Sequence, residues 1–360
     1  MSLGKLTVNG RRDGFLCEGK PFFWFADTCW SAFTSIPEAD WDYYLTRRAE
    51  QGMNVLQINT LPQWDRCCPD LGIWPYASED GVHFDWSQPN QAYWDRAAAM
   101  CRAAVEHGIR PALVLMWCNY VPGTWGAKIA ERCGADVMPR EEVRAHVARV
   151  VENLGEFDPV YVVTGDTDFA GDEAIAYYED ALDEVAKRAP EALRTMHINR
   201  GNRTIPAQYL DRLDFYMFQP GHNYEGQPEA WRLPQDFIAN YPKKPMVNSE
   251  PCYEQMGASR NVYWRFTAQD CRASVWSSIL AGASAGVTYG AHGVWNWQTS
   301  KSQGSVLGEG FDMPFRWQEC LQFAGVWDFA AIEHVLAGLG ATACDDALAV
   351  VPAQELLDDA

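Results

Sequence analysis

The sequence lacks several features that define common protein classes. No apolar run approaches the roughly 20 residues that a membrane-spanning helix needs, and the first 20 residues contain no apolar core of a signal peptide. No run of Lys or Arg is long enough to form a basic patch, and the net charge of −19 repels phosphate backbones and anionic lipids. The sequence therefore predicts no nucleic-acid and no membrane partner, and it leaves the oligomeric state open.

Short motifs of other protein classes are missing as well. No G-x-G-x-x-G or G-x-x-x-x-G-K-S/T follows an expected strand, so a phosphate cradle is not indicated. No C-x-x-C occurs, which argues against a structural zinc site. The 11 cysteines form an odd, irregular set. They favour reduced thiols and a cytoplasmic location over an exported protein with a trimmed signal.

The histidines are few and widely spaced. None of the seven lies within five positions of another, and the first expected strand has none. Barrel enzymes that use a metal commonly bind it with a closely spaced His pair. The sequence therefore predicts no metal and no cofactor, and a metal-dependent hydrolase or isomerase is kept as a less favoured alternative.

What is present indicates one large domain. The 360 residues are 48% hydrophobic and 13% aromatic, enough to bury a sizeable core. Apolar, β-rich runs alternate eight times with segments that carry an apolar residue every three to four positions, and this alternation predicts a parallel sheet. The eight strands are expected to begin near Phe22, Val55, Arg110, Val160, Arg194, Phe215, Pro245 and Gly286.

Eight strand–helix units favour closure into a (β/α)8 TIM barrel over an open sheet. Turn signals at 9–10 and 13–14 predict a small N-terminal β-hairpin over residues 5–25. We expect residues 1–340 to form the catalytic barrel including this hairpin, and residues 341–360 to be a tail that is either frayed or the start of a further β-domain. Helices are expected over residues 37–51, 89–107, 139–153, 172–189, 207–213, 234–240, 267–283 and 314–339.

Two expected strands end in a carboxylate. The run KKPMVNSEPCYE delivers Glu250 into a break made by Pro251, and VYVVTGD ends in Asp166. Barrel enzymes keep their chemistry at the carboxyl ends of the strands, and two carboxylates there are the minimum apparatus of a glycoside hydrolase. The plainer alternatives are a loop glutamate in a surface ion pair and an aspartate that caps the following helix.

Other strand ends carry neutral hydrogen-bonding groups and aromatic rings. This mixture suits a sugar, whose hydroxyls need directed hydrogen bonds and whose C–H faces lie against aromatic planes. A single Trp is more often core, Asp27 and Asp168 could serve as caps, and His197 is interpreted as a packed core histidine. The candidate substrate-binding residues are Asp27, Trp30, Asn59, Trp64, Trp117, Asn119, Asp168, Asn199, Gln219, His222, Tyr224, Tyr253, His292 and Trp295.

Three stretches together resemble the apiosidase-like glycoside hydrolases, over about residues 6–339. They are FFWFADTCWSAF with the following WDYYLTRRAEQGMNVLQINTLP, then VVTGDTD, and AGASAGVTYGAHGVWNW. The resemblance implies a TIM barrel in which Asp166 is the general acid/base and Glu250 the nucleophile. The sequence departs from the family pattern at Thr164, where a Gly is expected, and at Asp168, where an Asn is expected. The second departure places an extra negative charge beside Asp166.

These observations favour a retaining glycosidase that acts on a carbohydrate without a cofactor. A catalytically silent, carbohydrate-binding barrel is the alternative from another class. The geometry separates the two, because Asp166 and Glu250 should point into one pocket lined by Trp117, Tyr224 and Trp295. Retention needs the two carboxyl groups roughly 5 to 5.5 Å apart, whereas inversion leaves roughly 6.5 to 9.5 Å for a water.

Overall fold

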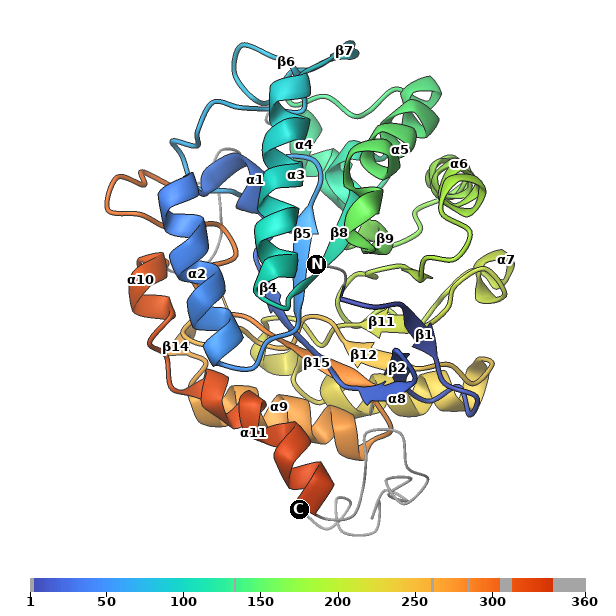
Figure 1. The fold of residues 1–360 in the computed structure, drawn as a ribbon, viewed down its shortest axis with the longest axis vertical. Helices are drawn as coiled ribbons and strands as arrows, with labels where there is room; N and C mark the ends of the chain where they lie inside the picture. The colour runs from blue at the N-terminus through green and yellow to red at the C-terminus, as the bar shows by residue number, and fades with distance from the viewer. Residues whose placement is uncertain (1–2, 133, 260–261, 284, 305–312, 339–360) are drawn as a thin grey trace.

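A computed structural model describes residues 3–132, 134–259, 262–283, 285–304 and 313–338. Eight parallel strands form its centre (Figure 1). Each pairs with a neighbour in chain order, and the last pairs back to the first. The strands are β4 (Trp24–Thr28), β5 (Val55–Asn59), β8 (Arg110–Trp117), β9 (Val160–Gly165), β10 (Arg194–Thr195), β11 (Tyr216–Phe218), β12 (Met246–Asn248) and β15 (Gly286–Tyr289).

Contacts at one seam complete the ring of strands. The ladder order leaves β10 and β11 at the two ends, and a parallel bridge between His197 and Met217 joins them. The hydroxyl of Thr195 also donates to the carbonyl of Phe215 across this seam, at 2.8 Å. The (β/α)8 barrel predicted from the sequence is therefore confirmed.

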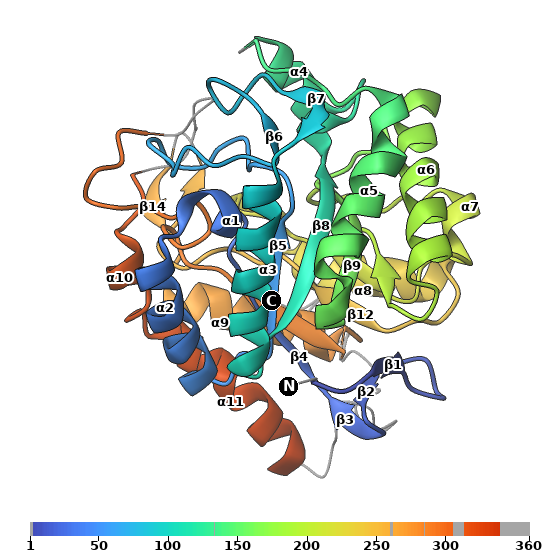
Figure 2. The ribbon, with the colours of Figure 1, turned by 45° about the horizontal axis from the view of Figure 1, so that its top comes forward.

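The strands form where the sequence is apolar without alternation. Every residue of β8 and of β9 is buried, as expected for strands covered on both faces. The helices enclose this sheet, as two views of the ribbon show (Figures 1 and 2). Their bounds are α1 (Ala32–Ser35), α2 (Glu38–Glu50), α3 (Gln91–Glu106), α4 (Trp125–Arg132), α5 (Arg140–Leu154), α6 (Asp172–Arg188), α7 (Ala207–Leu210), α8 (Glu229–Asn240), α9 (Ala268–Leu280), α10 (Trp317–Cys320) and α11 (Gly325–Gly338). None of the described helices has the length and apolar character needed to cross a bilayer.

Two helices differ from the prediction. Helix α8 begins five residues before Pro234, because Pro228 already occupies its N-cap position and Pro234 lies inside the helix. The segment expected as one helix over 314–339 is two, α10 and α11. At the first residue of α11 the chain approaches Glu254 so closely that the amide of Gly325 donates to its carboxylate at 3.0 Å. A Cβ at this glycine would lie 2.5 Å from the same carboxylate, so the break is fixed by packing.

The N-terminal hairpin is extended to a three-stranded antiparallel sheet of β1 (Leu6–Val8), β2 (Phe15–Cys17) and β3 (Lys20–Phe22). Figure 2 shows this sheet beside the start of β4. Phe15 is fully buried and packs its ring against Trp24 and Phe215, which lie at the amino-terminal ends of their strands. The sheet therefore closes the floor of the barrel. The predicted tail, residues 341–360, lies outside the described residues.

A buried ion pair joins the first barrel strand to its helix. The carboxylate of Asp27 lies 2.6 Å from the guanidinium of Arg48 and accepts a 2.7 Å hydrogen bond from Tyr44. Both charged side chains are completely buried. Arg48 also donates to Gln51, which donates in turn to the carbonyl of Leu321. Asp27 thus connects β4 to α2 and to the C-terminal helices.

This arrangement predicts a large loss of stability when one partner is removed. Arg48→Met should lower the free energy of unfolding by about 3–5 kcal/mol, because Asp27 would be left as an uncompensated buried charge. The matched control is Arg47→Met, which removes a solvent-exposed pair with Glu50 and should cost less than about 1 kcal/mol. Denaturant unfolding monitored by circular dichroism measures both. Equal losses for the two variants would contradict the prediction.

Candidate active site

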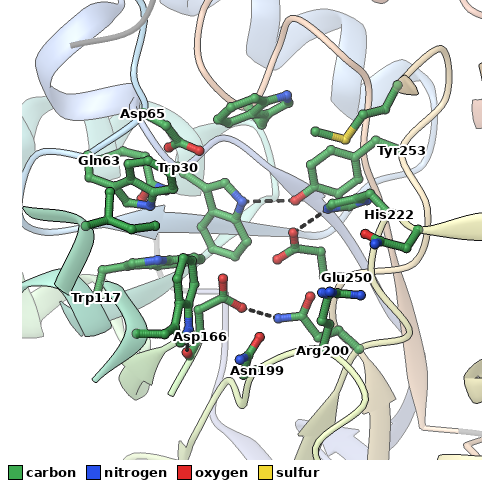
Figure 3. A pocket seen from close by; sticks show the side chains of 17 residues that line it. Trp30, Gln63, Asp65, Trp117, Asp166, Asn199, Arg200, His222, Glu250 and Tyr253 are labelled. Atoms are coloured by element: carbon green, nitrogen blue, oxygen red, sulfur yellow. Dashed lines mark hydrogen bonds and ion pairs between the residues drawn. The ribbon is translucent and has the colours of Figure 1, made fainter. Parts of the chain in front are cut away.

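A cavity of about 610 Å³ opens at the carboxyl ends of the barrel strands. Figure 3 shows Asp166 and Glu250 extending into it from opposite sides. Asp166 follows the last residue of β9, and Glu250 follows β12 by two residues. One carboxylate oxygen of each lies within 4.8 Å of the other, and the ring of His197 lies between them. The two candidate catalytic groups therefore share one pocket.

A histidine lies close to each carboxylate oxygen of Glu250. Oε1 lies 2.6 Å from Nε2 of His222, and Oε2 lies 3.0 Å from Nε2 of His197. Burial alone would raise the pKa of Glu250, but the hydrogen bonds and charges of the two histidines outweigh burial and lower that pKa below its usual range. The two histidines therefore favour the ionised form of Glu250.

Asp166 has the opposite electrostatic environment. Burial, followed by the negative charge of Glu250, raises the pKa of Asp166 to about 7. Gln219 donates an amide hydrogen bond to its Oδ1, and the indole of Trp125 donates to its backbone carbonyl at 2.8 Å. Two nearby carboxylates whose pKa values are driven apart are the pattern of an acid and a nucleophile in one site.

Local backbone geometry places these groups. Asp166 has φ +56°, a left-handed conformation that a non-glycine residue adopts at some cost. The preceding Gly165 is required by packing, since a Cβ there would lie 2.0 Å from the ring of Trp117. Gly290 has the same role on the other wall, where a Cβ would lie 1.9 Å from the ring of Tyr253. Two missing side chains thus make room for two aromatic walls.

The aromatic residues form a connected lining. Trp30 donates its indole N–H to the hydroxyl of Tyr253 at 3.0 Å and packs edge-on against Trp117 with ring centroids 5.1 Å apart. Tyr253 in turn packs against His222 at 4.1 Å between ring centroids. The rings are therefore fixed relative to Glu250. Ten residues predicted from the sequence line the cavity: Trp30, Trp64, Trp117, Asp166, Asn199, Gln219, His222, Glu250, Tyr253 and Trp295.

Six other predicted residues do not line the cavity, contrary to the expectation of direct contact. Four of them are buried away from the cavity, and Asp168 is partly buried. Asp27 faces Arg48, Asn59 bonds to Gln63, and His292 accepts from the indole of Trp295. Tyr224 is 58% exposed and packs against Trp264 outside the cavity. The six are Asp27, Asn59, Asn119, Asp168, Tyr224 and His292.

Several lining residues were not among the candidates. Gln63, Asp65 and Asn223 come from loops after strand ends, Trp125 and Ile129 come from α4, and Met256 precedes β13 (Gly257–Ser259). No periodic pattern marks such loop positions, so periodicity could not assign them to the cavity. Arg200 also lines the cavity, three residues after His197. His197 itself is fully buried, as expected, but it contacts both carboxylates, which its interpretation as a core residue missed.

In the part of the chain that the structure describes, Asp166, His197 and Glu250 are the one group whose side-chain atoms approach closely enough to share a cation. Their contacts already have another explanation. His197 Nε2 lies within hydrogen-bonding distance of Glu250, and a cation between them would have to replace that contact.

The family model of the apiosidase-like catalytic domain matches residues 12–342. The chain belongs to this family. The apiosidase-like family places it among the glycosidases with a TIM-barrel catalytic domain. No curated protein matches the sequence.

Solved structures with the same fold are distant in sequence from this apiosidase-like chain. A glycoside hydrolase family 5 protein from Bacteroides vulgatus ATCC 8482 is 21% identical with a TM-score of 0.75, over 93% of this chain and 72% of that one. A structure titled "Glycoside hydrolase" is 22% identical with a TM-score of 0.73, over 93% and 75%. A family 5 mannosidase from Rhizomucor miehei is 15% identical with a TM-score of 0.58, over 91% and 96%. These likenesses support the barrel fold.

The opposite pKa shifts of the two carboxyl groups can be tested without measuring turnover. Glu250→Gln should lower the pKa of Asp166 from about 7 toward the ordinary aspartate value, because the amide removes the neighbouring negative charge. Carboxyl ¹³C NMR titration measures the pKa of Asp166 in the variant. The matched control is Glu254→Gln, which replaces a buried glutamate bonded to Tyr289 and Gly325 and should leave the titration of Asp166 in place. An unchanged Asp166 titration in Glu250→Gln would contradict the arrangement.

Proposed function

We propose that the protein is a retaining glycoside hydrolase in which Glu250 is the nucleophile and Asp166 the general acid/base. The observation that carries this proposal is the pair of carboxylates with an oxygen–oxygen approach within 4.8 Å and oppositely shifted pKa values, in a cavity lined by aromatic rings. This separation matches direct attack better than the wider gap that an inverting enzyme leaves for a water. The barrel of residues 1–340 would be the catalytic domain.

In the first step, an oxygen of Glu250 forms a bond to the anomeric carbon while the glycosidic C–O bond breaks. The departing oxygen takes the proton of Asp166, so the aglycone leaves as an alcohol and Asp166 becomes a carboxylate. In the second step, Asp166 removes a proton from water. The water oxygen then bonds to the anomeric carbon, and Glu250 is released as a carboxylate.

The cavity walls supply what a sugar ring requires. Trp117, Trp295 and Tyr253 offer aromatic surface for C–H faces, while Asn199 and Gln63 offer neutral groups for hydroxyls. The solved relatives are named as glycoside hydrolases and a mannosidase, which supports a carbohydrate substrate. A catalytically silent sugar-binding barrel is the second candidate, because the same walls could hold a sugar without turnover.

Two substitutions test the assigned roles. Glu250→Gln should remove nearly all turnover on every glycoside, because the amide keeps the shape and loses the nucleophile. Asp166→Asn should reduce the hydrolysis of unactivated glycosides by about 10²–10⁴-fold and spare aryl glycosides with good leaving groups, which need little protonation. A panel of glycans and aryl glycosides, read by product analysis, measures both. Equal losses on the two substrate classes would argue that Asp166 is not the acid, and binding without turnover by the unaltered protein would favour the silent barrel.

The stereochemistry of the product is a second, independent test. A double-displacement mechanism should give a first-formed product with the anomeric configuration of the substrate, because the centre is inverted twice. Proton NMR during the first minutes of hydrolysis measures this before mutarotation. Dialysis against a chelator should leave the rate unchanged. An inverted product would exclude Glu250 as a nucleophile, and a rate lost on chelation and restored by a divalent ion would favour the metal-dependent alternative.

A further inference from the structure

His197 is fixed at the seam of the barrel, next to the two carboxylates. Its backbone forms the bridge to Met217, and its amide donates to the carbonyl of Thr164 at 3.0 Å. The side chain is completely buried, with the indole rings of Trp30 and Trp117 each 5.6 Å away between ring centroids. The imidazole therefore has a defined position and can be assigned its protons from its neighbours.

Ring nitrogen Nδ1 carries a proton. It lies 2.9 Å from the hydroxyl oxygen of Ser249. That hydroxyl has one proton, and it donates this proton to the carbonyl of Phe218 at 3.1 Å. The Ser249 oxygen can then only accept from the imidazole, so Nδ1 is the donor.

Ring nitrogen Nε2 faces acidic oxygens. It lies 3.0 Å from Oε2 of Glu250 and 3.7 Å from Oδ1 of Asp166. The amide nitrogen of Gln219 is also 3.0 Å away, but its two protons serve Asp166 and the carbonyl of Ile198. A lone pair on Nε2 would face the ionised oxygen of Glu250 and repel it. A proton on Nε2 makes the same contact attractive.

We propose that His197 is a positioning residue of the reaction, protonated on both nitrogens, that holds the nucleophile Glu250 through Oε2 and balances whichever carboxylate is charged. This role rests on the proposed function. In the free enzyme Glu250 carries the negative charge and Asp166 the proton. After Glu250 has formed its bond to the sugar, the charge is on Asp166. The imidazolium lies between the two carboxyl groups. It is therefore next to one negative charge both in the free enzyme and after the bond to the sugar has formed.

The charged and titratable groups around this ring are few. Glu250 and Asp166 face it from the segments after β12 and β9, His222 bonds the other oxygen of Glu250, and Arg200 acts on Asp166. Because His222 already holds Oε1, removal of His197 frees Oε2 alone. The expected effect is a weakened preference for the ionised nucleophile and a loss of its orientation, while the fold of the pocket wall is retained.

The test is His197→Gln, which keeps a neutral N–H donor and loses the charge. The acid limb of the kcat/KM profile, where Glu250 must be ionised, should move to higher pH by about one unit. The value of kcat/KM at neutral pH should fall by about 100-fold. The matched control is His146→Gln. It replaces a histidine that is equally buried and bonded to Tyr76 and Leu115, away from the carboxylates, and it should leave the limb in place.

Two further measurements keep the inference open to refutation if His197→Gln fails to fold. Ser249→Ala removes the acceptor of Nδ1 and should move the acid limb in the same direction by a smaller amount. Histidine ¹⁵N NMR of the unaltered protein near neutral pH should show protons on both nitrogens of His197, assigned by the change in Ser249→Ala. A single protonated nitrogen, or an acid limb that stays in place in both variants, would overturn the role of His197. Full turnover in Glu250→Gln would instead overturn the proposed function itself.

Discussion

The close approach of two carboxylates in a buried cavity is the constraint on which the site depends. At an oxygen–oxygen distance within 4.8 Å, two negative charges away from bulk water repel each other strongly, so one group must keep a proton. The unequal placement of hydrogen-bond donors determines which carboxyl group keeps the proton. Two histidines approach Glu250, whereas Asp166 receives an amide N–H from Gln219. The unequal distribution of donors thus drives apart the pKa values of two groups of similar chemistry.

The barrel supplies the positions that make this unequal distribution possible. Strands β9, β11 and β12 and the segment after β10 each contribute one or two polar groups at the same end of the sheet. The short strands at the seam bring distant parts of the chain together there. Two glycines complete the arrangement because they have no side chain. Gly165 and Gly290 leave the volume that the rings of Trp117 and Tyr253 fill. Side chains that are absent are as necessary to the cavity as those that line it.

The fold and the two carboxylates could be predicted because both depend on local patterns. All eight strands begin within two residues of the expected positions, and a carboxylate after a buried strand must emerge at the barrel mouth. The direction of a side chain near a strand end could not be predicted as well. Asp27 and His292 turn toward neighbouring elements rather than the cavity, and His197 was interpreted as core although it contacts both carboxylates. A shift of one residue in register decides whether such a side chain points into the cavity or away from it. That register is fixed only in the assembled barrel.

The bridge at His197 has a consequence for how the protein can be measured. The same residue closes the ring of strands through its backbone and reaches the carboxylates through its side chain. A molecule whose seam is open lacks the correct placement of His197, even if its helices are formed. A measurement of helical content would then not distinguish partly folded molecules from complete ones. A measurement of activity would detect only the complete molecules. For this chain, specific activity therefore reports the fraction of molecules in which the barrel is closed. After denaturation, activity should return more slowly than the helical signal.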